Sequence, residues 1–189
     1  MRRFALLAGA GMTLGLAAPA AAGDGFWDRL NALCGQAFEG ELLRAPEGDT
    51  SFEGQALFMH VRACEENRIR IPFVVGDDLS RTWVLTRHDD GRIELRHDHR
   101  HDDGSDDDVT MYGGFSPSEG GPHGRIFPAD DQTNGVIPGS WPNVWMMEVH
   151  PGERFVYFVQ RLGTERAFRV EFDLSEAVDA PPAPWGWED

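Results

Sequence analysis

The feature that most constrains the fold is a series of short strand-like runs separated by glycine- and aspartate-rich turns. The clearest hairpin signal is Asp89-Asp90-Gly91, because Asp-Gly pairs favour tight turns between antiparallel strands. Only the segment 24–37 shows apolar residues at helical spacing. The pattern predicts an all-β fold, an antiparallel meander of about eight to ten strands with one short N-terminal helix. The expected strands are 37–43, 55–64, 68–75, 81–87, 92–101, 109–112, 124–127, 144–149, 154–161 and 166–174.

Strands of this number, joined by short turns, form either a sandwich or a closed barrel. We favour a meander that closes into a barrel, with the N-terminal helix covering one end. In this arrangement the chain resembles a lipocalin-type (calycin) barrel, and Phe26-Trp27 before Gly35 and Gly40 is similar to the N-terminal Trp-and-Gly region of that family. The rest of the chain, after this N-terminal region, resembles secreted bacterial families of unassigned function.

Three regions follow from composition along the chain. Residues 1–22 have a basic start, an apolar run and a small-residue end, which predicts a signal peptide and a secreted or periplasmic protein. Residues 23–180 are expected to form a single β-barrel domain, and 181–189 a Pro/Trp-rich tail packed on its exterior. No run approaches the roughly 20 apolar residues of a transmembrane helix, so no transmembrane segment is predicted.

The charge of the chain narrows its partners. It carries 32 acidic and 17 basic residues, a formal net charge of −15. Nucleic acids and anionic membranes require a basic surface, so neither is an expected partner, and a protein partner stays undefined.

Two cysteines, Cys34 and Cys64, lie outside the signal segment. In an oxidising compartment an even number of cysteines most simply forms disulfides. We therefore predict a Cys34–Cys64 bond, which closes a loop of about 30 residues and contributes on the order of 3 kcal/mol.

The segment from Arg92 to His101 is the best candidate for a functional site. Because side chains alternate along a strand, one face carries three histidines with two apolar residues: His97, His99 and His101 with Ile93 and Leu95. This face is expected to line a core or cavity. Arg96 and Arg100 fall on the other face, where we expect solvent-exposed ion pairs.

Arginines embedded in apolar strands extend this candidate site. In a barrel, an inward guanidinium can pair bidentately with a ligand carboxylate or phosphate. The alternative is an arginine at the rim whose aliphatic stem lies on apolar surface. The predicted ligand-binding residues are His60, Arg62, Arg81, His97, His99, His101 and Arg161.

A metal site is a further hypothesis for the histidine row. Gly91, five residues and then His97-Asp98-His99 resemble the start of the first cupin motif, with Asp103 where that family has glutamate. Gly120 and His123 partly match the second motif. The resemblance implies a divalent transition metal bound by His97, His99, Asp103 and His123. The alternative is a row that only hydrogen-bonds to neighbouring carboxylates, and we assign no catalytic residue.

Two function classes remain open. The favoured one is an exported, non-enzymatic barrel that binds a small amphipathic or anionic ligand, with or without a metal at His97 and His99. The alternative is a metal-dependent enzyme on a cupin-like barrel. Nucleophile-elbow, zinc-protease and nucleotide-binding motifs are all absent from the sequence.

Overall fold

Eleven antiparallel strands in a single sheet and two short helices make up the described part of the chain. The computed structural model describes residues 25–117 and 121–187, so the predicted signal segment and the last two residues of the tail lie outside it. In chain order the elements are α1 (Gly25–Asn31), β1 (Ala37–Arg44), β2 (Leu57–His60), β3 (Ala63–Glu65), β4 (Arg68–Val75), β5 (Asp78–Arg87), β6 (Ile93–His99), β7 (Tyr112–Phe115), β8 (Gly124–Pro128), α2 (Asp131–Val136), β9 (Asn143–His150), β10 (Arg154–Arg161) and β11 (Ala167–Asp173).

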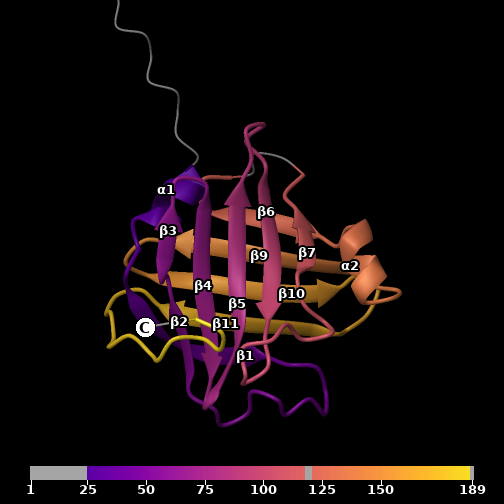
Figure 1. Cartoon of the computed structure of the whole chain (residues 1–189), viewed down its shortest axis with the longest axis horizontal. Helices are drawn as coiled ribbons and strands as arrows, with labels where there is room; N and C mark the ends of the chain where they lie inside the picture. Colours follow the sequence, from indigo (N-terminus) through magenta and orange to yellow (C-terminus); the bar gives the residue numbers. More distant parts are fainter. Residues whose placement is uncertain (1–24, 118–120, 188–189) are drawn as a thin grey trace, which may run out of the picture.

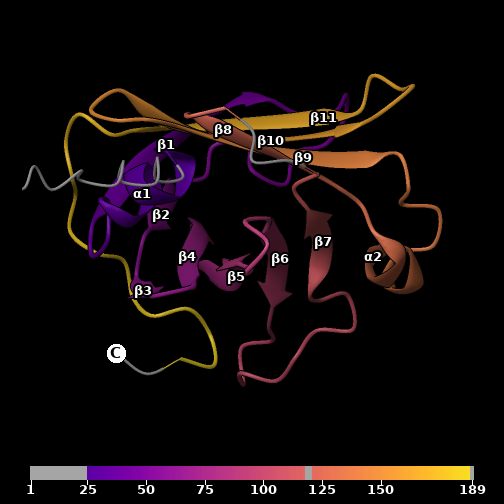
Figure 2. The same cartoon turned by 90° about the horizontal axis from the view of Figure 1, so that it is seen from above.

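The sheet folds over into two layers that face each other. Its strand order is β7-β6-β5-β4-β2-β1-β11-β10-β9-β8, with β3 paired to β4 beside β2. Figure 1 shows the layer containing β4, β5, β6 and β7 running across the layer containing β9, β10 and β11, and Figure 2 shows the two layers from above. The predicted all-β meander, nearly closed into a barrel, is confirmed.

Three details differ from the sequence prediction. The predicted strand 55–64 is broken at Val61-Arg62 into β2 and β3, which pair with successive parts of β4 and raise the strand number to eleven. The predicted strand 109–112 lies further along the chain, as β7 at Tyr112–Phe115. The third difference is the helix α2, in a segment that the sequence describes only as irregular.

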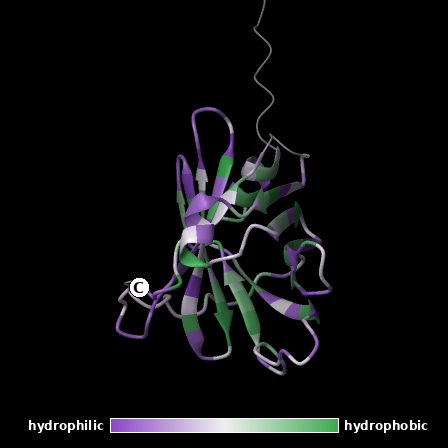
Figure 3. Cartoon of the chain, turned by 90° about the vertical axis from the view of Figure 1, so that its right-hand side faces the viewer, coloured by the Kyte–Doolittle hydropathy of each residue, from purple (hydrophilic) through white to green (hydrophobic). Residues whose placement is uncertain are grey.

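The core lies between the layers, where each strand turns alternate residues inward. Hydropathy alternates along several strands, as Figure 3 shows. Trp83, Phe155 and Phe172 are fully buried at the centre. Phe26 and Leu30 of α1 are also fully buried, and so this helix covers the core as predicted. A disulfide joins Cys34, just after α1, to Cys64 of β3.

Neither described helix has the length or the apolar character that crossing a membrane requires.

The two ends of the sheet, β7 and β8, meet at a seam. Within the described residues no ladder joins these strands, and α2 packs against β7 instead. The Thr133 hydroxyl accepts a hydrogen bond from the Gly113 N–H at 2.6 Å and donates one to the Gly113 carbonyl at 2.7 Å. A Cβ on Gly114 would lie 1.9 Å from the Pro128 carbonyl oxygen, so glycine is required where the two edges approach. One side chain thus satisfies backbone groups that a neighbouring strand would otherwise bind.

Arg96 corrects an expectation from the alternation of β6. It points away from the core, as predicted, but it is only 6% exposed. Its Nε donates to Glu94 at 2.7 Å and its two Nη groups donate to the carboxylate of Asp130, the N-cap of α2. The prediction of an exposed ion pair at Arg96 is therefore wrong, because α2 covers this part of the outer face and Arg96 fastens the seam.

The C-terminal tail lies against the outer face of the front layer. The Trp185 amide donates to the Leu79 carbonyl at 3.1 Å, and the Arg70 guanidinium lies 5.1 Å from the centroid of the Trp187 ring. Pro184, directly before Trp185, is buried. These contacts hold the tail along β4 and β5.

Candidate functional site

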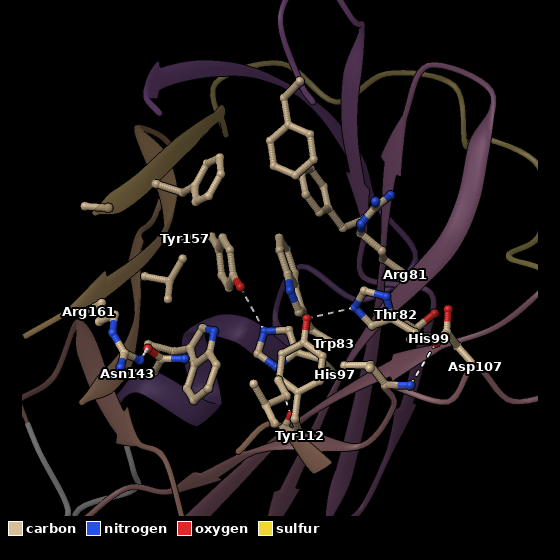
Figure 4. A pocket seen from close by; sticks show the side chains of 18 of the residues that line it. Arg81, Thr82, Trp83, His97, His99, Asp107, Tyr112, Asn143, Tyr157 and Arg161 are labelled. Carbon is tan, nitrogen blue, oxygen red and sulfur yellow. Dashed lines mark hydrogen bonds between the residues drawn. The ribbon is translucent and has the colours of Figure 1, made fainter. Parts of the chain in front are cut away.

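A cavity of about 360 Å³ opens between the two layers. Figure 4 shows its labelled side chains. Its walls are mainly aromatic, formed by Phe52, Phe73, Trp83, Tyr112, Trp145, Tyr157 and Phe168. Its polar residues include Arg81, His97, His99, Asp107, Asn143, Arg161 and Arg166. The volume lies near the lower end of the roughly 300–1,000 Å³ typical of small-molecule sites.

Strand register places the two histidines in this cavity. His97 pairs with Trp83 of β5, and His99 pairs with Arg81. Arg81 in turn lies opposite Phe73 of β4. Directly opposed residues share a face of the sheet, and therefore the row from β4 to β6 presents aromatic, arginine and histidine side chains to one space.

His97 lies at the base of the cavity and is 3% exposed. Its Nδ1 lies 3.0 Å from the Tyr112 carbonyl oxygen, which can only accept, so Nδ1 carries the proton and donates. Nε2 then accepts from the Tyr157 hydroxyl at 2.9 Å. Burial lowers the pKa of His97 to about 3, and burial raises the pKa of Tyr157 well above its ordinary value. Both groups are neutral at pH 7.

His99 and Tyr112 form a second pair nearer the mouth. The Tyr112 hydroxyl lies 3.0 Å from His99 Nε2. Burial lowers the pKa of His99, and the Arg81 guanidinium lowers it further. Burial raises the pKa of Tyr112 to about 12. This pair is also uncharged at pH 7.

Ring stacking fixes the shape of the walls. Phe73 stacks on Trp83 with centroids 4.9 Å apart, and Trp83 stacks on Tyr157 at 4.5 Å. His97 stacks on Tyr112 at 4.6 Å. Because these rings support one another, the cavity has a rigid aromatic wall that suits an apolar group.

The charged side chains lie closer to the mouth of the cavity. Some of them form ion pairs within the protein and others do not. Arg81 forms an ion pair with Asp78. Arg161 donates to the amide oxygen of Asn143 at 3.2 Å. Neither Arg161 nor Arg166 forms an ion pair among the residues that the structure describes. The charge of Arg166 does reach a carboxylate, because it contributes to lowering the pKa of Asp49.

The structure gathers some of the predicted site residues and separates others. Arg81, His97, His99 and Arg161 line the cavity together. The remaining predicted residues, namely His60, Arg62, His101, Asp103 and His123, do not line it.

These separated residues have surroundings of their own. His60 is buried, and burial together with the charge of Arg62 lowers its pKa. His101 and Asp103 are exposed in the turn after β6. His123 stacks on His150 at the β8–β9 edge, with ring centroids 5.0 Å apart.

The predicted metal ligands are therefore not brought together. In residues 25–117 and 121–187, no group of three or more His, Cys, Asp or Glu side chains could hold a metal ion. His97 already uses both ring nitrogens in hydrogen bonds within the protein. These contacts favour a hydrogen-bonding role for the row.

Sequence reasoning missed Tyr112, Trp145, Tyr157 and Asp107 as cavity residues. Tyr157 shares its strand face with Phe155, so alternation places it inward, but nothing local to β10 indicates a histidine partner on β6. Asp107 lies in an acidic turn whose composition is typical of a solvated loop.

Fold and site together define an antiparallel β-barrel with an aromatic cavity of ligand size. Comparison with known proteins gives no further assignment: no family model, curated protein or solved structure matches the chain.

Proposed function

We propose that this protein is an exported, non-enzymatic barrel that binds a small amphipathic ligand with an anionic end. The observation that carries the proposal is an aromatic cavity lined by Arg161, a half-buried arginine with no carboxylate partner in the described chain. The apolar part of the ligand lies against Trp83, Trp145 and Tyr157. The anionic end lies beside Arg161 and Arg166, where a guanidinium can donate two parallel hydrogen bonds to a carboxylate or sulfonate.

The state of the histidines supports binding over catalysis. A general acid–base group works best with a pKa near the operating pH. His97 has a pKa of about 3 and both its nitrogens are occupied, so it suits a structural or hydrogen-bonding role. The dispersed metal ligands give no support to the alternative of a metal-dependent enzyme.

The disulfide supports the exported location. Cys34 and Cys64 are joined in the structure, and stable disulfides belong mainly to oxidising compartments. The lipocalin-type resemblance stays an architectural comparison, to which the nearly closed antiparallel barrel corresponds.

Two matched fluorescent probes test the proposal. 1-Anilinonaphthalene-8-sulfonate carries an anion, and N-phenyl-1-naphthylamine has the same aromatic body without it. We expect Arg161→Gln to weaken binding of the sulfonate about tenfold, equivalent to roughly 1.4 kcal/mol, and to leave the neutral probe unchanged. Arg154→Gln is the control, because Arg154 lies on the same strand, outside the cavity, and pairs with Glu153. Equal sulfonate affinity for Arg161→Gln and the native protein would contradict the proposal.

A further inference from the structure

We infer that the ligand is a zwitterion whose cationic and anionic ends lie on either side of an aromatic body. This inference rests on the proposed function and specifies its ligand class. It is carried by Asp107, a carboxylate that faces the same cavity as Arg161.

Asp107 and Arg161 stand on opposite walls. Asp107 belongs to the loop between β6 and β7, in the front layer, whereas Arg161 ends β10 in the back layer. Figure 4 shows the two residues on opposite sides of the group formed by His97, Trp83 and Tyr157. Facing sheets pack about 10 Å apart, and so the two charges are too far from each other to form a direct ion pair.

Each of the two charges lacks a side-chain counterion in the described chain. The Asp107 carboxylate accepts a hydrogen bond from the Val109 amide at 2.8 Å, which orients it without neutralising it. Arg81, the arginine that lines the cavity from the same layer, is held by Asp78. Arg161 contacts only a neutral amide, that of Asn143.

The arrangement sets the polarity of the ligand. A cationic group beside Asp107 and an anionic group beside Arg161 would each gain a counterion that the protein does not supply. Between them, the stacked rings of Trp83 and Tyr157 form part of a rigid aromatic wall for an apolar body. A purely anionic ligand would satisfy Arg161 alone, and it would leave a carboxylate facing its other end.

Three probes of one shape separate these cases: 4′-(aminomethyl)biphenyl-4-carboxylate, biphenyl-4-carboxylate and biphenyl-4-ylmethylammonium. Binding is measured by titration calorimetry on the native protein and on Asp107→Asn, Arg161→Gln and Asp108→Asn. Asp108 is an exposed neighbour that does not line the cavity and serves as the matched control.

We expect the zwitterion to bind at least about tenfold more tightly than either singly charged probe. Asp107→Asn should reduce its affinity to that of the carboxylate probe, and Asp108→Asn should change nothing. If the carboxylate probe binds as tightly as the zwitterion and only Arg161→Gln weakens both, the zwitterion inference is overturned and the proposed function stands. If Arg161→Gln alters neither of the two probes that carry a carboxylate, the proposed function fails as well.

Discussion

The imidazole of His97 is buried with a defined tautomer, because one nitrogen faces a carbonyl and the other faces a phenol. The Tyr157 ring is held in turn by Trp83, which stacks on it with ring centroids 4.5 Å apart. A buried polar group that loses its partner costs about 1–3 kcal/mol, so this small network contributes both to stability and to the shape of the cavity base.

Replacement of Tyr157 by phenylalanine should expose that cost. Tyr157→Phe removes the donor to His97 Nε2 without changing the ring, and we expect a loss of about 1–3 kcal/mol in the free energy of unfolding. Tyr112→Phe is the control, since its partner His99 lies nearer solvent, and its loss should stay below about 1 kcal/mol. Urea unfolding measures both. A larger loss for Tyr112→Phe would contradict the assigned network.

The low pKa of His97 also predicts a pH dependence of stability. In the unfolded chain the imidazole titrates near its ordinary value of 6.5, whereas in the folded protein its pKa is about 3. Between these values the unfolded state binds more protons, and so stability falls as pH is lowered. From pH 7.5 to pH 5 this single group accounts for a loss of about 2 kcal/mol.

The measurement compares His97→Gln with the native protein by urea unfolding at pH 7.5 and pH 5. The variant is expected to be less stable than the native protein at both pH values. Its free energy of unfolding should fall by about 2 kcal/mol less than that of the native protein between pH 7.5 and pH 5. Other titrating groups are common to the two proteins and cancel. Parallel pH profiles would contradict the low pKa, because they would mean that His97 has the same pKa in the folded and unfolded states.

For single residues, the sequence predicts which way a side chain points better than it predicts which residues the side chain contacts. The alternation of β6 correctly indicates a shared face for His97, Ile93 and Leu95, all of which are buried. It gives no information on Arg96, because exposure of an outer-face residue depends on what covers that face. Arg96 is covered by a segment more than thirty residues further along the chain, as its bond to Asp130 shows.

Among the helices and strands, α2 is a short element that is held in place at the seam by polar contacts. It has six residues, including Gly135, and its one buried side chain is Thr133. Such a helix has little intrinsic stability, since isolated short helices are marginal in water. Its position depends on polar contacts: the Asp130 cap, the Arg96 ion pair and the hydrogen bonds of Thr133.

Thr133→Val tests whether the seam depends on this hydroxyl. Valine has a similar shape but cannot bind the Gly113 N–H and carbonyl, so we expect a loss of about 2–3 kcal/mol in the free energy of unfolding. Gln132→Ala, on the same helix, removes one exposed bond to the Met111 carbonyl and should cost under about 1 kcal/mol. Faster hydrogen exchange at Gly113 in Thr133→Val would locate the effect, and unchanged exchange and stability would contradict it.

The helix could not be predicted from its sequence for a physical reason. The segment has no apolar periodicity, because it does not contribute a hydrophobic face to the core. Its function is to satisfy the free edge of β7, and that requirement arises only after the sheet has folded over. Long strands with alternating burial, such as β9, are predictable because their own residues create the face that they bury.

For the whole molecule, turn spacing and alternation were enough to predict an antiparallel, nearly closed barrel. The sequence shows a glycine- and proline-rich interruption between β7 and β8, but it does not show that the barrel stays open there. The disulfide could be predicted from the even cysteine count together with the predicted export, and it joins the segment just after α1 to β3.

Removal of the disulfide should destabilise the entire barrel. The bond closes a loop with a sequence separation of 30 residues, for which chain entropy gives about 3–4 kcal/mol. The double variant Cys34→Ser/Cys64→Ser should therefore unfold at a lower urea concentration. Circular dichroism of the folded variant should match the native protein, and an unchanged midpoint would contradict a stabilising role.

The pairing of β1 with β11 has a consequence for how the protein folds. Gly40 lies opposite Phe172, so this ladder joins the two ends of the chain, while the other ladders join strands that are near in sequence. Contacts between distant residues form late, because closing a long loop costs entropy before any contact forms. We expect β1–β7 and β8–β11 to organise separately and to dock in the last step. Val170→Ala on β11 should then accelerate unfolding with little effect on the folding rate, whereas Val149→Ala within the β9–β10 hairpin should slow folding in stopped-flow measurements.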